Sequence, residues 1–306
     1  MGQLPTISVV LPTRDRPELL REAAESVLAQ EWPPLELLVV EDGARGRASG
    51  VLHRLHRRGP VAIRLLRGPG RGPGAARNVG LREARGELIA FLDDDDLWLP
   101  DKLRRQAIWF AQRPELGLVG ALCVRRRDPM PLVPRPIGRR ERLRPVTRAA
   151  LVRANRLVTS SVLVRRACFD AVGGFDESLT LAQDWDMWLR IAGRCQVGIV
   201  LAALMVYRVH GGQRSADRLA MREWEVEVLR RELSRCGARR RGAGLLHRRL
   251  AWGHCRLGRL LARRGDTTRA AEELRRSRAL FPYNPMTWCS LLRCVLAHGA
   301  PAGAEP

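Results

Sequence analysis

The sequence contains almost no lysine. Lys102 is the only one, and arginine supplies the other 53 of the 54 basic side chains, for a formal net charge of +22. So extreme a ratio is typical of a GC-rich coding bias, and the arginines are spread along the whole chain. We therefore expect no specific nucleic-acid partner, while a polyanion or an anionic membrane surface stays open as a partner of the basic surface.

The sequence also lacks paired cysteines, long apolar runs and a leader pattern. Its seven cysteines form no Cys-x-x-Cys pair and no zinc-ligand spacing, which is typical of a reducing compartment. No apolar run is long enough for a transmembrane helix. The first residues lead into a strand pattern without the regions of a signal peptide. We expect a cytoplasmic protein.

What the sequence does have is a cluster of four carboxylates. The apolar run Leu88–Leu92 predicts a buried strand, and Asp93–Asp96 follow it directly. Adjacent like charges repel one another, so a solvated acidic turn is the simpler interpretation of such a run by itself. Ligands of open α/β sheets, however, bind at the carboxyl ends of the strands. Because Mg²⁺ and Mn²⁺ prefer carboxylate oxygens, the run is a candidate divalent-cation site.

The first half of the chain alternates strand and helix patterns. This alternation predicts an α/β fold with a mainly parallel sheet covered by helices on both faces. The predicted strands are Ile7–Leu11 (stopped by Pro12), Leu35–Val40, Ala62–Leu66, Leu88–Leu92 and Leu116–Val124, and the predicted helices are Pro17–Gln30, Arg47–Arg57, Ala75–Ala84 and Pro100–Gln112.

The middle of the chain is less regular. Residues Asp128–Arg148 are rich in proline and arginine and lack periodicity, which predicts a long loop of the kind that can form a lid beside a site. Beyond it we predict a strand at Val158–Val164, a turn at Gly173–Asp176, a helix at Trp185–Ala192 and a last strand at Leu204–Val209.

From about Arg218 the pattern changes to helix after helix, so we predict two domains, residues 1–217 and 218–306. Leu245–Arg264 and Thr267–Leu280 resemble one tetratricopeptide-type hairpin. One such unit cannot bury its own face, which makes it either a structural cap on the main domain, the interpretation we favour, or a docking module. The amphipathic end around Trp288–Leu296 suggests contact with anionic lipid at the inner face of the membrane.

Six motifs follow one another between about Pro5 and Ser215. They are Ile7–Arg16, Val39–Gly43, Gly74–Gly80, the acidic run, Leu181–Arg190 and Tyr207–Ser215. In this order they resemble the family 2 glycosyltransferases, which have a GT-A fold, invert the sugar and use nucleotide-diphosphate sugars. The resemblance implies a GT-A fold with a small all-α appendage at the C-terminal end.

The resemblance assigns the nucleotide-sugar contacts to the first four motifs. The turn with Pro12, Thr13 and Arg14 would meet the base or ribose, and Asp42 would accept a hydrogen bond from a base N–H. In the third motif Arg77 would meet phosphate and Asn78 a hydroxyl. The acid at Asp93 would lie near the ribose, with Asp94 also on the nucleotide side.

The implied cofactor is a divalent cation, Mg²⁺ or Mn²⁺, that stabilises the departing diphosphate. The family's Asp-x-Asp places the metal on Asp95, although a run of four acids leaves the register open, so Asp94 and Asp96 stay candidates. His210 in the last motif is a candidate ligand of the metal or the diphosphate. A lone histidine is more often structural, and both interpretations of His210 stay open.

The resemblance makes Asp184 the catalytic residue, as the general base that deprotonates the acceptor hydroxyl. The alternative is that Asp184 only caps the helix that follows. Gln183 stands where the family often has glutamate, which removes one charge beside the base. Asp186 is interpreted as first-turn stabilisation of the same helix.

The implied function is transfer of a hexose-like unit from a nucleotide-diphosphate sugar to a hydroxyl acceptor, such as a glycan or a lipid-linked glycan, in the synthesis of a surface polysaccharide or glycan. One alternative is a nucleotidyltransferase of related fold, which normally has a glycine-rich loop where this chain has Thr13–Arg16. The other is a non-catalytic, arginine-rich binding protein. Contacts that select the sugar and the acceptor are expected in residues 128–158 and 173–180.

Overall fold

The computed structural model describes residues 5–43, 46–55, 61–127, 142–213, 216–237, 243–283 and 285–290. The chain forms two compact units, Met1–Gln213 and Arg214–Pro306. The domain boundary after residue 217 rests on where the family motifs end, and it stays a prediction. In the described parts of the chain, no helix is long and apolar enough to cross a membrane.

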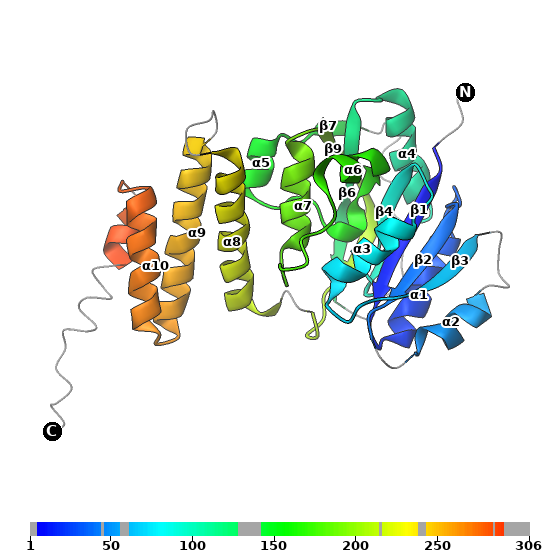
Figure 1. Ribbon diagram of the computed structural model, residues 1–306, viewed down its shortest axis with the longest axis horizontal. Helices are drawn as coiled ribbons and strands as arrows, with labels where there is room; N and C mark the ends of the chain where they lie inside the picture. The colour runs from blue at the N-terminus through cyan, green and yellow to red at the C-terminus, as the bar shows by residue number, and fades with distance from the viewer. Residues whose placement is uncertain are drawn as a thin grey trace, which may run out of the picture. The chain divides into compact units, whose positions relative to one another are not determined.

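A mixed sheet forms the centre of the N-terminal unit (Figure 1), and its described strands run in the order β3-β2-β1-β4-β8-β6-β9-β5, with β7 paired to β9. The strands are β1 (Ile7–Thr13), β2 (Glu36–Glu41), β3 (Ala62–Arg67), β4 (Leu88–Phe91), β5 (Asp96–Trp98), β6 (Leu116–Arg126), β7 (Leu143–Pro145), β8 (Leu163–Arg165) and β9 (Gln196–Arg208).

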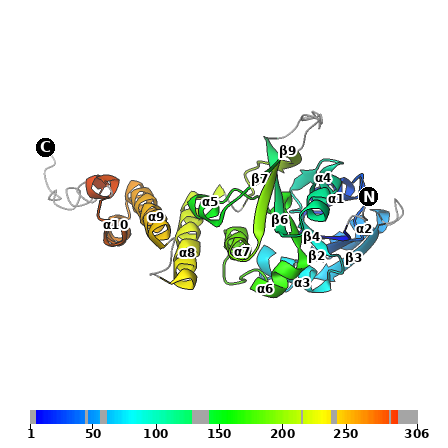
Figure 2. The ribbon, with the colours of Figure 1, turned by 90° about the horizontal axis from the view of Figure 1, so that it is seen from above.

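Helices cover both faces of this sheet. Figure 2 shows α1 and α4 on one side and α3 and α6 on the other. The helices of the unit are α1 (Pro17–Leu28), α2 (Ala48–Leu55), α3 (Pro73–Glu83), α4 (Lys102–Gln112), α5 (Arg148–Arg153), α6 (Arg166–Val172) and α7 (Gln183–Ala192), with a 3-10 turn η2 at Thr159–Ser161.

The half of the sheet formed by β3, β2, β1 and β4 is parallel throughout. Every residue of β1, β2 and β4 is buried, as expected for strands covered on both faces. Helix α3 packs closely on β1, because a Cβ at Gly80 would lie 2.4 Å from Cγ1 of Val10. This arrangement confirms the α/β fold and the parallel sheet predicted for the first half of the chain.

The other half of the sheet mixes directions. Strand β8 is antiparallel to β4 and β6, and β9 is parallel to β6 but antiparallel to β5 and β7. The long strand β9 therefore joins three neighbours. Its final residues, next to β5, lead directly to the segment that carries His210.

Pro12 does not stop the first strand, contrary to the prediction, because β1 continues to Thr13. The oxygen of Val10 accepts from N–H of Leu92 on the β4 side, and that of Thr13 accepts from N–H of Asp42 on the β2 side. Since alternate residues point their backbone groups to opposite sides, Pro12 points toward β4, beyond the last β1–β4 pair. Its missing N–H costs no ladder bond there.

Several elements differ from the sequence prediction. Strand β9 begins at Gln196, well before the predicted Leu204, and the predicted strand Val158–Val164 is the turn η2 followed by β8. The described end of the predicted loop 128–148 contains β7, and α5 follows it. Residues 128–141 of that loop lie outside the described residues.

The C-terminal unit contains the helices α8 (Arg218–Cys236), α9 (Ala243–Arg263) and α10 (Thr267–Leu280). Gly265, at a φ of +84°, turns the chain between α9 and α10, and the carboxylate of Asp266 accepts from the N–H of Arg269 at 3.1 Å. Nδ1 of His254 lies 2.6 Å from Oε2 of Glu273, which joins the two helices in a buried contact. The helices predicted here are present, whereas part of the segment 288–296 lies outside the described residues.

Candidate functional site

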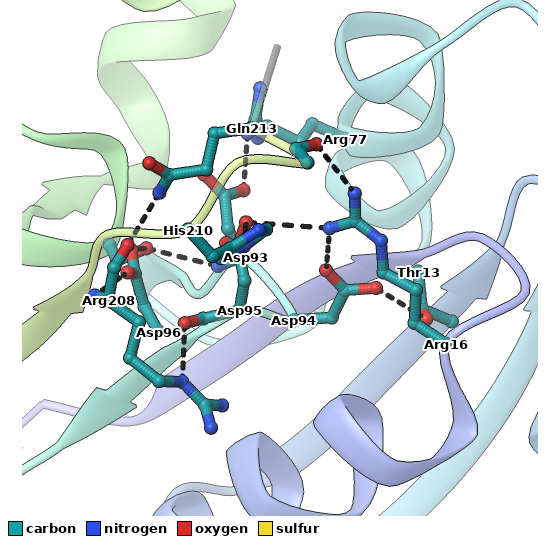
Figure 3. Close-up of polar contacts among 12 residues, drawn as sticks. Thr13, Arg16, Arg77, Asp93, Asp94, Asp95, Asp96, Arg208, His210 and Gln213 are labelled. Carbon is teal, nitrogen blue, oxygen red and sulfur yellow. Dashed lines mark hydrogen bonds and ion pairs between the residues drawn. The ribbon is translucent and has the colours of Figure 1, made fainter. Parts of the chain in front are cut away.

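The four carboxylates form a tight turn between β4 and β5, which we call the acidic turn (Asp93–Asp96). The N–H of Asp96 donates to the oxygen of Asp93 at 3.0 Å, which closes the turn. Because each residue of a turn points in a different direction, each carboxylate meets a different set of partners (Figure 3). Charge repulsion within the run is offset by two arginines from other segments, Arg16 and Arg77.

Asp93 pairs with Arg77 of α3. The Arg77 guanidinium is buried, and its Nη1 also donates to Oε1 of Gln183 at 3.3 Å. Nε of Arg77 has no hydrogen-bond partner among the described residues. One arginine thus connects the acidic turn to the start of α7, and a buried N–H of it is still available to an anionic group.

Asp94 points toward β1. Its Oδ2 accepts from the hydroxyl of Thr13 at 2.8 Å, and its Oδ1 lies 3.4 Å from Nη1 of Arg16. Burial raises the pKa of Asp94 to about 6, with the charges of Asp95 and Asp93 adding to the rise, and the Thr13 hydroxyl and Arg16 opposing it. Thr13 therefore serves the acidic turn in this structure, and its predicted contact with the nucleotide stays a prediction.

Asp95 lies next to His210, so the structure brings the two candidate metal ligands together. Nε2 of His210 lies 3.1 Å from Oδ2 of Asp95, and Nη1 of Arg16 lies 3.4 Å from the same oxygen. Among the described residues, no group of three or more His, Cys, Asp or Glu could hold a metal ion. The carboxylate nevertheless fits Mn²⁺ or Mg²⁺, which would complete its shell with substrate phosphates and water, and a neutral imidazole is a common metal ligand.

Asp96 does not face this open pair. It is 1% exposed, its Oδ2 accepts from the hydroxyl of Ser160 at 2.6 Å, and its Oδ1 accepts from the N–H of Arg208 at 3.3 Å. Burial, first of all, raises the pKa of Asp96 well above its usual range. Both of its oxygens are used inside the protein, so Asp95 is the better placed candidate for a metal ligand in the acidic turn.

Arg208, the last residue of β9, supports the acidic turn. Its Nε donates to the backbone oxygen of Asp95 at 2.7 Å, and its Nη1 pairs with Glu22 of α1. The side-chain amide of Gln213 in turn donates to the backbone oxygen of Arg208. Arg208, the buried arginine of the last motif, thus holds the backbone of the acidic turn in place.

Asp42 lies at the end of β2, as predicted, but its carboxylate is occupied. Oδ1 accepts from the N–H of Gly70 and Oδ2 from the N–H of Gly72, both at 2.7 Å. A Cβ at Gly68 would lie 2.6 Å from Oδ1 of Asp42, so this loop must pass close to the acid. Asp42 shapes the loop that precedes α3, and its contact with a base stays a prediction.

Asn78 holds a loop in this structure, and its contact with a hydroxyl of the donor stays a prediction. Its amide donates to the oxygen of Phe175 and to Oε1 of Glu177, both at 2.9 Å, and its Oδ1 accepts from the N–H of Phe175 at 2.7 Å. Both amide hydrogens are therefore used. The side chain clamps residues 173–177 to α3, and in this arrangement it has no N–H left for a sugar hydroxyl.

Asp184 lies in the first turn of α7, which begins at Gln183, and is not the cap residue of that helix. Its Oδ1 accepts from the N–H of Trp185 at 2.8 Å, and its Oδ2 accepts from the amide of Asn155 at 2.9 Å. Burial raises the pKa of Asp184, and the charge of Asp93 adds to this rise. The hydrogen bonds from Asn155 and from the N–H of Trp185, together with the charge of Arg77, oppose it. Asp186 instead pairs with Arg190 at 2.9 Å within the same helix.

Sequence reasoning missed Ser160, Arg208 and Arg16 as parts of the site. Ser160 both donates to Asp96 and accepts from the N–H of Asp93 at 3.1 Å. Arg16 and Arg208 belong to quoted motifs, but in a chain with 53 arginines no charge pattern singles them out. Pro12 is buried and Arg14 is exposed, and neither contacts the acidic turn in a described hydrogen bond.

Two family models match the chain. The model of glycosyl transferase family 2 matches residues 8–158, and that of glycosyltransferase like family 2 matches residues 146–239. Together they cover all six motifs except for Ile7, the first residue of the first motif. The predicted resemblance is confirmed by both.

Curated relatives agree with the family models. An uncharacterised glycosyltransferase of Nostoc is 37% identical over 113 residues, 37% of this chain and 35% of the relative. One of Rickettsia typhi is 26% identical over 234 residues, 74% of this chain and 70% of the relative. The succinoglycan biosynthesis protein ExoW of Rhizobium meliloti is 38% identical over 100 residues, 32% of this chain and 31% of the relative. The chain thus matches about a third of the length of two of these relatives.

Solved structures show the same fold. TarS 1–349 of S. aureus, in complex with UDP-GlcNAc, has a TM-score of 0.68 at 16% identity over 94% of this chain and 89% of that one. Mannosyltransferase PcManGT of Pyrobaculum calidifontis, in complex with GDP-Man and Mn²⁺, has a TM-score of 0.66 at 22% identity over 98% of this chain and 82% of that one. The predicted GT-A fold is confirmed. On the two family models and these relatives, the chain belongs to glycosyl transferase family 2.

Proposed function

We propose that the protein transfers a sugar from a nucleotide-diphosphate sugar to a hydroxyl acceptor, with inversion at the transferred carbon. The observation that supports this function best is the position of Arg77. It pairs with Asp93 of the acidic turn and donates to Gln183, next to Asp184. The guanidinium of Arg77 thereby links Asp93, the acid proposed for donor binding, to the residue next to Asp184, the proposed base.

On the donor side, Asp93 is proposed to contact the ribose, with the turn Pro12–Arg14 and Asp42 beside the base. Arg77 is proposed to meet the diphosphate, since its buried Nε lacks a partner among the described residues. We assign Asn78 a positioning role instead, because its amide is used by Phe175 and Glu177.

The divalent cation is proposed to bind Asp95 and His210, whose facing atoms are 3.1 Å apart. When bound, such a cation stabilises negative charge on the departing nucleoside diphosphate. PcManGT was solved with Mn²⁺, and the carboxylate and imidazole donors of this chain fit the same ion. Arg77, which pairs with Asp93, would add a second positive charge near the same phosphates.

Asp184 is proposed to take the proton of the acceptor hydroxyl as its oxygen attacks. Its raised pKa makes the carboxylate a stronger base than a solvated aspartate. The base must be ionised, so the transfer rate is expected to rise with pH through the pKa of Asp184 and to be lost on the acid side. Asn155 and the N–H of Trp185 fix the orientation of the carboxylate.

The biological setting is proposed to be the synthesis of a surface polysaccharide or glycan. The relative in Rhizobium meliloti is named for succinoglycan biosynthesis, which supports a polysaccharide product. We further propose that the enzyme is cytoplasmic and meets a glycan or lipid-linked acceptor at the inner face of the membrane.

The function is tested by incubating the protein with a panel of nucleotide sugars and Mn²⁺ or Mg²⁺, followed by analysis of the anomeric product. Asp184→Asn keeps the shape of the side chain but cannot take a proton. We expect donor binding to persist and transfer to fall by about 10²–10⁴-fold. Asp186→Asn, on the same helix, is the matched control. Near wild-type transfer by Asp184→Asn would reduce Asp184 to a structural residue.

A further inference from the structure

Arg16 reaches into the acidic turn from the segment between β1 and α1. Its Nη1 lies 3.4 Å from Oδ1 of Asp94 and 3.4 Å from Oδ2 of Asp95, and its Nη2 donates to the oxygen of Gly212 at 3.3 Å. Figure 3 shows this side chain directed toward the carboxylates. The oxygen of Asp95 that Arg16 approaches is the one that also faces His210. The guanidinium therefore lies where the proposed cation site would be.

The backbone before Arg16 directs the side chain to this place. Asp15 has a φ of +54°, a left-handed conformation that few residues other than glycine and Asn or Asp adopt. Arg16 follows as the residue that precedes the first turn of α1, at Pro17. The chain thus reverses between strand and helix with Arg16 on the side of the acidic turn.

Arg16 differs from the other two arginines at the turn. The side chains of Arg77 and Arg208 are 6% and 7% exposed, whereas that of Arg16 is 35% exposed. Its contacts of 3.4 Å are longer than a well-formed charge-assisted hydrogen bond. Partly exposed pairs of this kind are weak, so Arg16 can leave its partners at little cost.

A guanidinium and a divalent cation cannot use Asp95 together. The guanidinium has five N–H donors and no lone pair, so it cannot coordinate a metal, and its charge repels one. Without a cation, however, it places a positive charge 3.4 Å from an oxygen of each of the adjacent carboxylates Asp94 and Asp95. The same residue is therefore useful before the cation binds and obstructive afterwards.

We propose that Arg16 is an exchangeable counter-charge, which neutralises Asp94 and Asp95 in the cation-free enzyme and leaves Asp95 when a divalent cation binds. This inference rests on the proposed assignment of Asp95 as a metal ligand. Arg16 is a positioning residue in this role, because it acts on the carboxylates and not on the sugar.

The test is Mn²⁺ binding to the full-length protein, measured by calorimetry or electron paramagnetic resonance without nucleotide. We expect Arg16→Gln to bind Mn²⁺ about three- to tenfold more tightly than the wild type, the range for loss of one nearby charge at a partly exposed site. The cation-free variant should also melt at a lower temperature and gain more from Mn²⁺. Arg21→Gln, which removes an exposed charge from the neighbouring helix α1, where Arg21 pairs with Glu25, should match the wild type.

Mn²⁺ affinity that is unchanged, weakened or undetectable in Arg16→Gln would overturn the inference. Asp95→Asn should abolish the gain, and a gain that survives in the double variant would place the competition elsewhere. Because no sugar is involved, these results are independent of transfer. A wild type that shows the Mn²⁺ competition but transfers no sugar from any donor would refute the proposed function and leave the exchange at Arg16 intact.

Discussion

At the scale of the residue, the environment of Lys102 disfavours a charged amine. It is 0% exposed at the first position of α4, its Nζ donates to Oε1 of Gln106 at 2.7 Å, and it lies 4.2 Å from the ring centroid of Trp98. Burial lowers the pKa of Lys102 to about 7. The neutral amine still donates to Gln106, whereas the ammonium would have no carboxylate partner among its described contacts.

Lys102 should therefore make stability depend on pH. Between about pH 7 and the ordinary lysine pKa, the unfolded chain binds a proton that the folded chain does not, so stability rises with pH through this window. We expect Lys102→Met to stabilise the protein relative to the wild type more at pH 6 than at pH 10. The unpaired Gln106 oxygen costs about 1–3 kcal/mol at both values.

Thermal melts of the two proteins at several pH values measure this difference. Gln106 also donates to the oxygens of Val119 and Ser161, and these bonds are unchanged by the substitution. A difference in stability that stays constant from pH 6 to pH 10 would show that Lys102 titrates normally.

At the scale of the element, α3 and the loop 173–177 are joined by one side chain. Asn78→Ala removes three hydrogen bonds to Phe175 and Glu177 and leaves the buried N–H of Phe175 without a partner. One such loss costs about 1–3 kcal/mol. We expect a lower melting temperature and reduced transfer to acceptor, because this loop leads to Asp184, with donor affinity nearly unchanged.

Arg71→Ala is the matched control, because Arg71 pairs with Glu177 of the same loop at 2.8 Å but is largely exposed. Its loss should cost less than about 1 kcal/mol. Nucleotide binding is measured by calorimetry and stability by thermal melts. If Asn78→Ala lost donor affinity and kept its stability, the result would show that Asn78 contacts the donor directly.

The elements that the sequence predicts well are those with strong local patterns. The apolar runs of β1, β2 and β4 and the periodicity of α1, α9 and α10 identify them without knowledge of the fold. Strand β5 has only three residues and starts inside the acidic run, so no period marks it. Strand β7 is equally short, and its pairing with β9 depends on residues far along the chain.

In the candidate site too, the residues with a local sequence pattern can be predicted and those that depend on distant contacts cannot. The acids at strand and helix ends are visible as motifs, so Asp93, Asp95 and Asp184 can be selected from the sequence. Their supports are not visible, because Ser160 meets Asp96 across 64 positions of the chain and Asn78 meets Phe175 across 97. Whether an amide or carboxylate faces a ligand or a loop is decided by such distant contacts, as at Asn78.

At the scale of the whole molecule, every residue assigned to the proposed chemistry lies in the unit Met1–Gln213. We expect a chain truncated after residue 217 to keep nucleotide binding. If the C-terminal helices form a cap, the truncated protein should be less stable or less soluble. If they form a docking module, it should stay soluble and active on a small acceptor but lose a partner or membrane fraction. Calorimetry, melts and sedimentation separate these outcomes.

Collapse of the truncated chain together with loss of all donor binding would contradict the domain division. The matched control is a chain of full length with Glu273→Gln, which alters the contact with His254 inside the C-terminal unit. It should reduce the stability of that unit without touching nucleotide binding.

The burial of the one lysine has a practical consequence for the study of this protein. An amine-reactive reagent finds no exposed lysine side chain anywhere in the sequence, since Lys102 is enclosed between α4 and β5. Modification of Lys102 therefore requires the N-terminal unit to open, and its rate measures how often that happens. Mass spectrometry of the labelled peptide would thus count opening events at a single, naturally placed reporter, and a bound donor or cation should slow the labelling in proportion to its affinity.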